Sequence, residues 1–203
     1  MFFAAFFSMI LDHIGLVLYP DEYIFRILGR LAFPCFVFMI VEGIKRTRDL
    51  NKYIYRMALI AVISQVPYMY MIGSFKLNTC FSLLLILLIF KFIRNQDYLP
   101  ALIYSIMSVF PVFDYGFLGV LFALIYYYIK DFPLQYLLLA VVTIAYSLIY
   151  NSEIQVFTII YFPLVWILAT LPDINVYPRL KYSLYPGHLI ILAFTLYIHN
   201  IVM

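Results

Sequence analysis

The sequence predicts an all-α fold, a polytopic integral membrane bundle of about nine transmembrane helices, with eight to ten acceptable. Of the 203 residues, 67% are hydrophobic, and the mean hydropathy is +1.02. Charged residues make up only 11%, less than half the usual share in a soluble domain. The apolar residues also fall in long runs with short polar connections between them, which is typical of membrane-spanning helices.

Nine apolar runs give the helix count. They lie at 1–19, 27–44, 54–72, 80–93, 100–113, 115–130, 133–150, 155–171 and 184–203. Several are shorter than the roughly 20 residues that a straight span needs. The connection FPVFDYG at 110–116 can be a tight outer turn or a re-entrant bend. No linker is long enough to separate domains, so residues 1–203 are predicted to form a single domain.

The first run carries two polar residues in its apolar interior, Asp12 and His13. A charge in hydrocarbon is costly, so such residues are candidates for function. Adjacent helix positions are about 100° apart, so the two side chains must meet different partners. Asp12 shares its face with Ser8 and Gly15 instead. Histidine suits proton transfer near neutral pH, which makes His13 a catalytic candidate, with a polar helix-packing contact as the alternative.

The second helix begins FRILGRLAFPC, which places Arg26 and Arg30 on one face. Pro34 cannot donate to the carbonyl of Arg30, so we expect a kink there. Arg30 is expected to pair with Asp12, because the pair would lower the cost of burying both charges. Arg26 is expected to extend its guanidinium to the headgroups, with a substrate contact as the alternative.

The connection after the second helix, KRTRDLNKYIYR, is strongly basic. It carries Lys45, Arg46, Arg48, Lys52 and Arg56. It can be a topology signal or a site for the phosphate groups of a cytosolic cofactor. Glu42 precedes it and can form ion pairs along the helix, or serve function. The chain has no Gly-rich phosphate loop, so nucleotide binding of the P-loop or Rossmann kind is not supported.

The positions of the cations predict the orientation. Under nine-helix alternation, ten of the thirteen lysines and arginines fall on one side. They are the five of the basic connection together with Lys91, Arg94, Lys130, Arg179 and Lys181. The positive-inside rule then predicts a cytoplasmic N-terminus and an external C-terminus. His13 would lie in the outer half of the first helix.

Two later segments contain prolines beside polar residues. In ISQVPY, Pro67 frees the carbonyl of Ile63, and Ser64 and Gln65 are close enough to satisfy it. In SLYPGHLIIL, Pro186 is expected in the first turn of the last helix. His188 would then lie near a helix N-terminus, where the dipole attracts anions.

The chain shows no metal-binding spacing. Cys35 and Cys80 both lie in or beside apolar runs and form neither a metal motif nor a disulfide framework. We therefore interpret them as small buried side chains, and we expect no metal.

Together these stretches resemble the TraX family, which is named for the protein that acetylates the N-terminus of conjugative pilin. MILDHIG resembles its opening signature, FRILGRLAFPCFVFMIVEGIKRTRDLNKYIYR its second block and ISQVPY its third. LNTCFSLLL is a weaker match to an Asn-containing block, and YPGHLIIL resembles the C-terminal block. The residues between about 95 and 180 resemble the family only in hydropathy.

The resemblance implies a multi-pass acetyltransferase of the plasma membrane. It would take acetyl-CoA from the cytosol and acetylate an amine or hydroxyl outside, on a peptide such as a pilin N-terminus or on an envelope glycan. By matching motif, His13 would be the catalytic residue, as general base or covalent carrier, with Asp12 and Arg30 beside it. Substrate contacts are assigned to Arg26 and Glu42, and CoA contacts to Lys45, Arg46, Arg48 and His188.

A second hypothesis is a non-catalytic membrane accessory subunit or a small proton-coupled transporter, since intramembrane His, Asp and Arg also suit a proton path. The sequence shows no inverted repeat and no matching pair of broken helices, which transporters of that kind often have. The expected surroundings are the lipid bilayer, and no nucleic-acid partner is expected. The sequence gives no oligomeric state.

Overall fold

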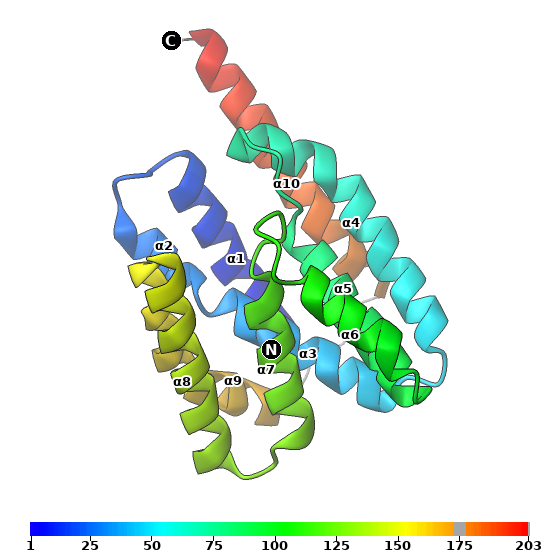
Figure 1. The fold of residues 1–203 in the computed structure, drawn as a ribbon. Coiled ribbons are helices and arrows are strands. Elements are labelled where there is room, and N and C mark those ends of the chain that lie inside the picture. Colours follow the sequence, from blue (N-terminus) through cyan, green and yellow to red (C-terminus); the bar gives the residue numbers. More distant parts are fainter. Residues whose placement is uncertain (173–177, 203) are drawn as a thin grey trace. The chain divides into compact units, whose positions relative to one another are not determined.

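The computed structural model describes residues 1–172 and 178–202, without the side chains of 178–179, 199–200 and 202. Arg179, one of the cations assigned to the cytoplasmic side, therefore lies outside the described side chains. The elements in chain order are α1 (Phe2–Val17), α2 (Tyr23–Gly29), α3 (Ala32–Arg46), α4 (Leu50–Ile72), α5 (Thr79–Arg94), α6 (Tyr98–Met107), α7 (Gly116–Tyr128), α8 (Phe132–Tyr150), the 3-10 helix η1 (Glu153–Phe157), α9 (Thr158–Thr170) and α10 (Pro178–Val202) (Figure 1).

The all-α prediction is confirmed for the described residues. Helices α2 and α3 are two parts of one interrupted segment, and η1 continues directly into α9. The described chain thus holds nine helical segments, and each overlaps one of the nine apolar runs. The number of membrane crossings and the cytoplasmic N-terminus stay predictions.

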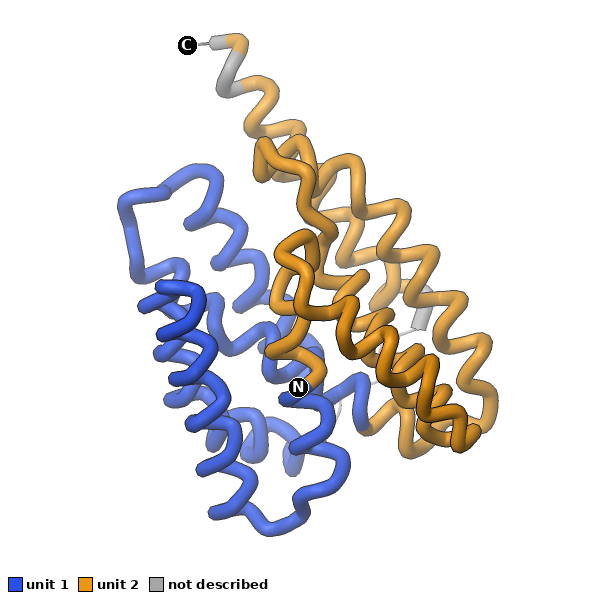
Figure 2. Tube along the Cα trace, viewed as in Figure 1, with its two compact units in different colours: residues 1–41, 121–175 blue, residues 42–120, 176–203 orange. Residues whose placement is uncertain are grey.

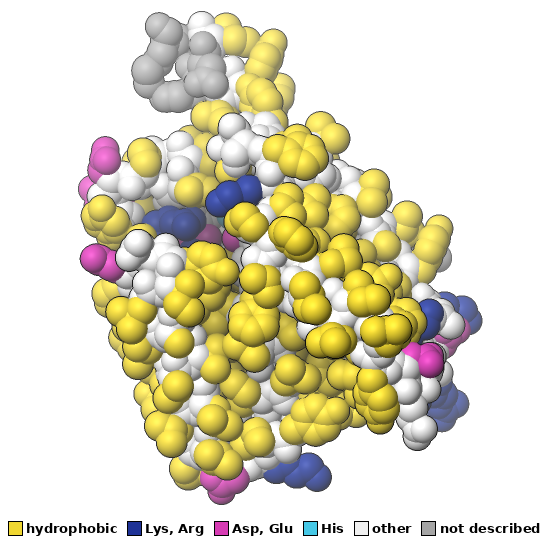
Figure 3. Space-filling view, viewed as in Figure 1, with side chains coloured by type: hydrophobic (Ala, Val, Ile, Leu, Met, Phe, Trp, Pro, Cys, Tyr) yellow, Lys and Arg dark blue, Asp and Glu magenta, His cyan; other side chains and the backbone are white. Residues whose placement is uncertain are grey.

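Three segments are long and apolar enough to cross a membrane: Tyr23–Arg46, Phe132–Tyr150 and Glu153–Thr170. Helices α1, α6 and α7 are apolar but shorter. Hydrophobic side chains cover most of the face shown in Figure 3, and many large ones are exposed, such as Val66 at 76% and Leu148 at 75%. Apolar surface on this scale is unusual for a soluble monomer and suits contact with lipid.

The contacts divide the chain into two compact units (Figure 2). Unit 1 contains residues 1–41 and 121–175, and unit 2 contains residues 42–120 and 176–203. The boundaries fall inside α3 and α7, so each of these helices contributes to both units. The prediction of a single domain over 1–203 stays a prediction.

In unit 1, α1 packs closely on α2 because two glycines allow it. A Cβ atom at Gly29 would collide with the side chain of Asp12, and one at Gly15 would collide with Phe25. The adjoining core contains Ala5, Leu31, Cys35 and Val165. Small residues at the contact let two helix backbones approach, as in membrane bundles generally. The close approach places the polar residues of α1 against α2.

In unit 2, α4 packs on α5 and α10, and α5 packs on α6. Asn78 caps α5, where its side chain accepts from the N–H of Cys80 at 3.0 Å. Pro67 lies inside a continuous α4. The expectation for its neighbours was wrong: Gln65 bonds to Asn78 and to the carbonyl of Lys76, and Ser64 Oγ has no partner among the described residues. Neither satisfies the carbonyl of Ile63, because the α4–α5 connection folds back onto Gln65.

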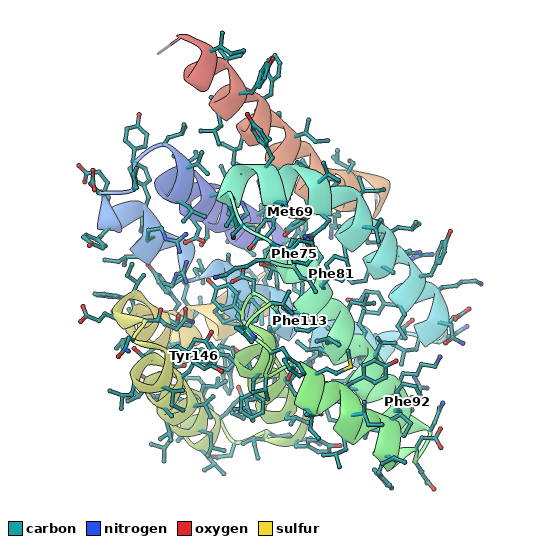
Figure 4. All side chains as sticks on the ribbon, turned by 45° about the horizontal axis from the view of Figure 1, so that its top comes forward. Met69, Phe75, Phe81, Phe92, Phe113 and Tyr146 are labelled. Atoms are coloured by element: carbon teal, nitrogen blue, oxygen red, sulfur yellow. The ribbon has the colours of Figure 1, made fainter. Side chains whose placement is uncertain are left out.

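The connection FPVFDYG is an irregular turn held at the start of α5. A parallel bridge joins Leu77 to Phe113, and the Asp114 carboxylate accepts from Thr79 Oγ1 at 2.9 Å. Figure 4 marks Phe113 on this connection and Phe75 on the α4–α5 connection. The two connections therefore lie at the same end of unit 2. This is expected for helices that run alternately up and down, because every second connection then falls on the same side.

Most described cations of unit 2 lie at the opposite end, whereas Lys76 lies on the α4–α5 connection. Since the α4–α5 and α6–α7 connections lie together, the start of α4 and the end of α5 lie away from them. The Arg56 guanidinium lies 5.9 Å from the ring of Tyr182, which brings the first half of α10 to the start of α4. Lys and Arg side chains are visible at this margin in Figure 3. Within unit 2, most described Lys and Arg side chains therefore lie at one end, as the sequence predicts.

Candidate functional site

The structure brings Asp12, Arg26 and Arg30 together in one ion-pair cluster. The Asp12 carboxylate lies 3.0 Å from Nη1 of Arg26 and also accepts from Nη2 of Arg30. The predicted Asp12–Arg30 pair is therefore present. Arg26 pairs with Asp12 as well, because the spacing of four residues turns both arginines toward α1, where one carboxylate accepts from both. That the rest of its guanidinium extends to the headgroups stays a prediction.

The break between α2 and α3 explains how Arg30 reaches Asp12. Helix α2 ends at Gly29 and α3 begins at Ala32, so the kink predicted from Pro34 is present as an interruption. The backbone N–H of Arg30 donates to the carbonyl of Ile27. Arg30 Nε then donates to the carbonyl of Arg26 at 3.1 Å, which fixes the guanidinium beside its own backbone.

Two residues that the sequence analysis missed complete the site. Gln155 Oε1 accepts from Arg30 Nη1 at 3.0 Å, and Gln155 Nε2 donates to Thr158 Oγ1 at 3.0 Å. Both side chains are buried. The only signal was a glutamine at the start of an apolar run, too little to indicate a partner 125 residues away from Arg30.

The two arginines differ in how many of their guanidinium nitrogens are already bonded within the protein. Arg30 is 5% exposed and bonded at all three guanidinium nitrogens. Of its two proposed roles, this favours holding Asp12 over stabilising an oxyanion. Arg26 is 23% exposed and uses only Nη1, which also contacts the Asp12 carbonyl at 3.3 Å. Within the described chain, its Nε and Nη2 groups have no partner and can reach a substrate.

His13 is buried in α1 at 6% exposure. The charges of Asp12, Arg26 and Arg30 all act on its ring. As predicted, Asp12 lies on the same helix face as Ser8, and this face meets α2: Ser8 Oγ donates to the carbonyl of Leu28 at 2.7 Å. The Asp12 carboxylate favours a positive charge on the ring when it takes a proton, whereas the guanidinium groups of Arg26 and Arg30 oppose it.

In unit 2, most cations of the basic connection already have carboxylate partners. Glu42 pairs with Lys45 at 3.1 Å and with Arg46 at 2.9 Å along α3, so the intrahelical alternative is present. Asp49 pairs with Lys52 at 3.3 Å and caps α4. The N–H bond from Lys52 lowers the pKa of Asp49 below its usual value.

Arg48 and Arg56 are the exceptions among the described residues of this connection, and Arg56 lies over the ring of Tyr182. Arg48 has no such ring contact within the described chain. It is exposed and, among the described residues, forms no ion pair. A guanidinium with all its donors available suits a phosphate group. Arg48 is therefore the strongest phosphate-binding candidate of the connection.

The expected position of His188 was wrong. Helix α10 spans Pro178–Val202, and Pro186 lies inside it, so His188 is not at a helix N-terminus and gains nothing from the dipole there. Its Nδ1 lies 3.2 Å from the carbonyl of Leu184, and its ring packs edge-on against Tyr185. A helix in a membrane tolerates an internal proline, which the proline pattern alone did not indicate.

The predicted site residues thus divide between the units. Asp12, His13, Arg26 and Arg30 come together in unit 1, whereas Glu42, Lys45, Arg46, Arg48 and His188 belong to unit 2. Among the described residues, no three His, Cys, Asp or Glu side chains are placed to hold a metal ion.

One comparison with known proteins gives a match. A family model described as TraX protein matches residues 2–195. The matched range includes residues 95–180, where the motifs gave no support. Comparisons with curated proteins and with solved structures give no match.

Proposed function

The chain belongs to the TraX family, and on this premise we propose that it is a multi-pass plasma-membrane acetyltransferase. It would move an acetyl group from cytosolic acetyl-CoA to an amine or hydroxyl on the outer side, on a peptide N-terminus such as that of pilin or on an envelope glycan. The observation that carries the proposal is the buried His13 beside an Asp12 carboxylate held by two arginines.

The chemistry assigned to His13 is proton or acetyl transfer. In the first form, the acceptor nitrogen or oxygen attacks the thioester carbonyl while the imidazole takes the acceptor proton; the C–S bond breaks and the CoA thiolate leaves. In the second form, the imidazole attacks the thioester carbonyl, the C–S bond breaks and the CoA thiolate leaves; the acceptor then attacks the acetyl-imidazole, the C–N bond to the ring breaks, and the acceptor proton passes to the released imidazole. Asp12 stabilises the imidazolium, and the unused N–H groups of Arg26 are placed to stabilise an oxyanion.

A proton-coupled transporter is the competing function, because buried Asp, His and Arg within membrane helices also mark proton paths. Purified protein incubated with labelled acetyl-CoA separates the two. CoA release, acetyl-protein or a CoA-binding signal would support the enzyme. Absence of all three, with proton-coupled uptake of a solute into vesicles, would support the transporter.

The first prediction concerns orientation. Cysteine at position 51 should be protected from a membrane-impermeant thiol reagent in intact cells, whereas cysteine at position 21 or 76 should react. Residues 21, 51 and 76 are all exposed, and the native Cys35 and Cys80 are buried, so the background should be low. Labelling at 51 without labelling at 21 and 76 would reverse the orientation and the depth assigned to His13.

The second prediction concerns the acyl donor. Arg48→Ala should weaken CoA binding by roughly 1–3 kcal/mol if the guanidinium makes a charge-assisted contact to phosphate. Arg46→Ala should have a smaller effect, because Arg46 is already paired with Glu42. Binding can be measured by titration calorimetry on purified protein. Unchanged CoA affinity in Arg46→Ala, Arg48→Ala and His188→Ala alike would leave the basic connection as a topology signal only.

A further inference from the structure

Gln155 links the ion-pair cluster of Asp12, Arg26 and Arg30 to a different part of the chain. We propose that it is a positioning residue: it holds the Arg30 guanidinium in the orientation in which Arg30 holds Asp12, and so fixes the negative charge beside His13. The catalytic part of this inference rests on the proposed acetyl transfer. The coupling of Gln155 to Asp12 through Arg30 rests on geometry alone.

The first step of the argument is the way Arg30 is held. The guanidinium is planar, and each of its nitrogens is bonded in a different direction: Nε to the carbonyl of Arg26, Nη2 to Asp12 and Nη1 to Gln155. Two of these anchors belong to the α1–α2 pair. Gln155 supplies the third from η1, which packs on α2. Without Gln155, the guanidinium loses its anchor from η1.

The second step is the orientation of the Gln155 amide. A guanidinium has only N–H donors, so the amide must present its oxygen to Arg30. Gln155 Nε2 donates to Thr158 Oγ1 at 3.0 Å, and Thr158 is fully buried. The threonine hydroxyl therefore keeps the amide nitrogen on the side away from Arg30. Hydrogen-bond donation thus runs from Arg30 to Gln155 and on to Thr158, and separately from Arg30 to Asp12.

The third step is charge. Asp12 is a single carboxylate between two arginines. A neutral amide anchors Arg30 without competing for its charge, so Asp12 stays the anionic partner. A glutamate at 155 has almost the same shape and would offer Arg30 a second anion 3 Å away, at the position of the present 3.0 Å contact. Substitutions at residues 12 and 155 can therefore move the carboxylate that pairs with Arg30 from the Asp12 side to the Gln155 side.

Moving that counter-ion tests the coupling without an activity assay. Asp12→Asn should lower the unfolding temperature in detergent, because it leaves two arginines without their carboxylate. Adding Gln155→Glu should recover at least half of that loss. The matched control is Gln135→Glu: Gln135 is another buried glutamine of unit 1, bonded to Trp166 and to the carbonyl of Ile129, and it should recover nothing. Equal unfolding temperatures for Asp12→Asn and Asp12→Asn/Gln155→Glu would overturn the coupling.

Kinetics test the positioning role. Gln155→Leu keeps the size of the side chain and removes both hydrogen bonds. It should lower kcat for acetyl transfer by about 10- to 100-fold, since small displacements at a reacting centre are costly, and leave KM for acetyl-CoA unchanged. Gln135→Leu should lower stability to a similar degree and keep kcat. Equal kcat for Gln155→Leu and Gln135→Leu would overturn the positioning role.

The two experiments also separate this inference from the proposed function. Wild-type protein that transfers no acetyl group would overturn the proposed function and with it the positioning role, while the unfolding temperatures would still decide the coupling. Active wild-type protein with no recovery in Asp12→Asn/Gln155→Glu would overturn the coupling and leave the proposed function standing.

Discussion

His13→Ala is expected to lower the rate of acetyl transfer by about 10²- to 10⁴-fold, the usual effect of losing a general base. The loss is larger if the acetyl group passes through the imidazole covalently. His13 is buried in α1, and its ring lies within the electrostatic influence of Asp12, Arg26 and Arg30. Their charges can act on a ring that gains a proton during the reaction. The measurement is transfer of labelled acetyl to an amine or hydroxyl acceptor, with CoA release followed alongside.

Ser8→Ala is the matched control for this variant. Ser8 is a buried polar residue of the same helix and bonds only to the carbonyl of Leu28 in the described structure. We expect Ser8→Ala to keep the wild-type transfer rate, and both variants to express and fold like the wild type. A well-folded His13→Ala protein with the wild-type rate would return the histidine to a packing role and remove the mechanism.

Asp12→Asn is expected to reduce stability more than any other single change in the site. Removing one partner of a buried ion pair costs about 3–5 kcal/mol, because the remaining charge stays buried. Here one carboxylate serves both Arg26 and Arg30, and the Asp12 and Arg30 side chains are only 14% and 5% exposed, so water can compensate Arg30 only poorly. The effect on transfer should be milder than that of His13→Ala. Thermal unfolding in detergent measures the loss.

Glu42→Gln is the control for the loss of a carboxylate. Glu42 also serves two cations, but Lys45 and Arg46 are exposed, and exposed pairs contribute about 0–1 kcal/mol. The control should therefore unfold close to the wild-type temperature. An Asp12→Asn protein as stable as Glu42→Gln would show that water or lipid headgroups compensate the arginines, and would contradict the expected cost of removing the carboxylate.

Hydropathy predicted the helices well because the nine runs report directly which residues avoid water. The interruption between Gly29 and Ala32 was also predictable, since a proline leaves the carbonyl four residues earlier without its donor. The Asp12–Arg30 pair followed from the cost of burying either charge alone. Each of these inferences uses residues close in sequence or the cost of a buried charge that few nearby side chains can offset.

Contacts between distant elements were less accessible. Gln155 reaches Arg30 across 125 residues, and a single glutamine in an apolar run does not indicate what it binds. The prediction for His188 was wrong for another reason: Pro186 was interpreted as part of the first turn of a helix, whereas it lies inside α10, which spans Pro178–Val202. Membrane helices tolerate internal prolines, so the usual rule for helix starts is weaker here.

The central claim is that an acetyl group passes from a cytosolic thioester to an acceptor on the other side of the membrane through His13. The most direct measurement uses sealed vesicles with the Lys45–Arg56 connection facing outward, labelled acetyl-CoA outside and a peptide with a free N-terminus or a hydroxylated glycan trapped inside. The account predicts labelled acceptor inside and free CoA outside with the wild type, and neither with His13→Ala. Intact acetyl-CoA inside the vesicles, or equal labelling by both proteins, would contradict it.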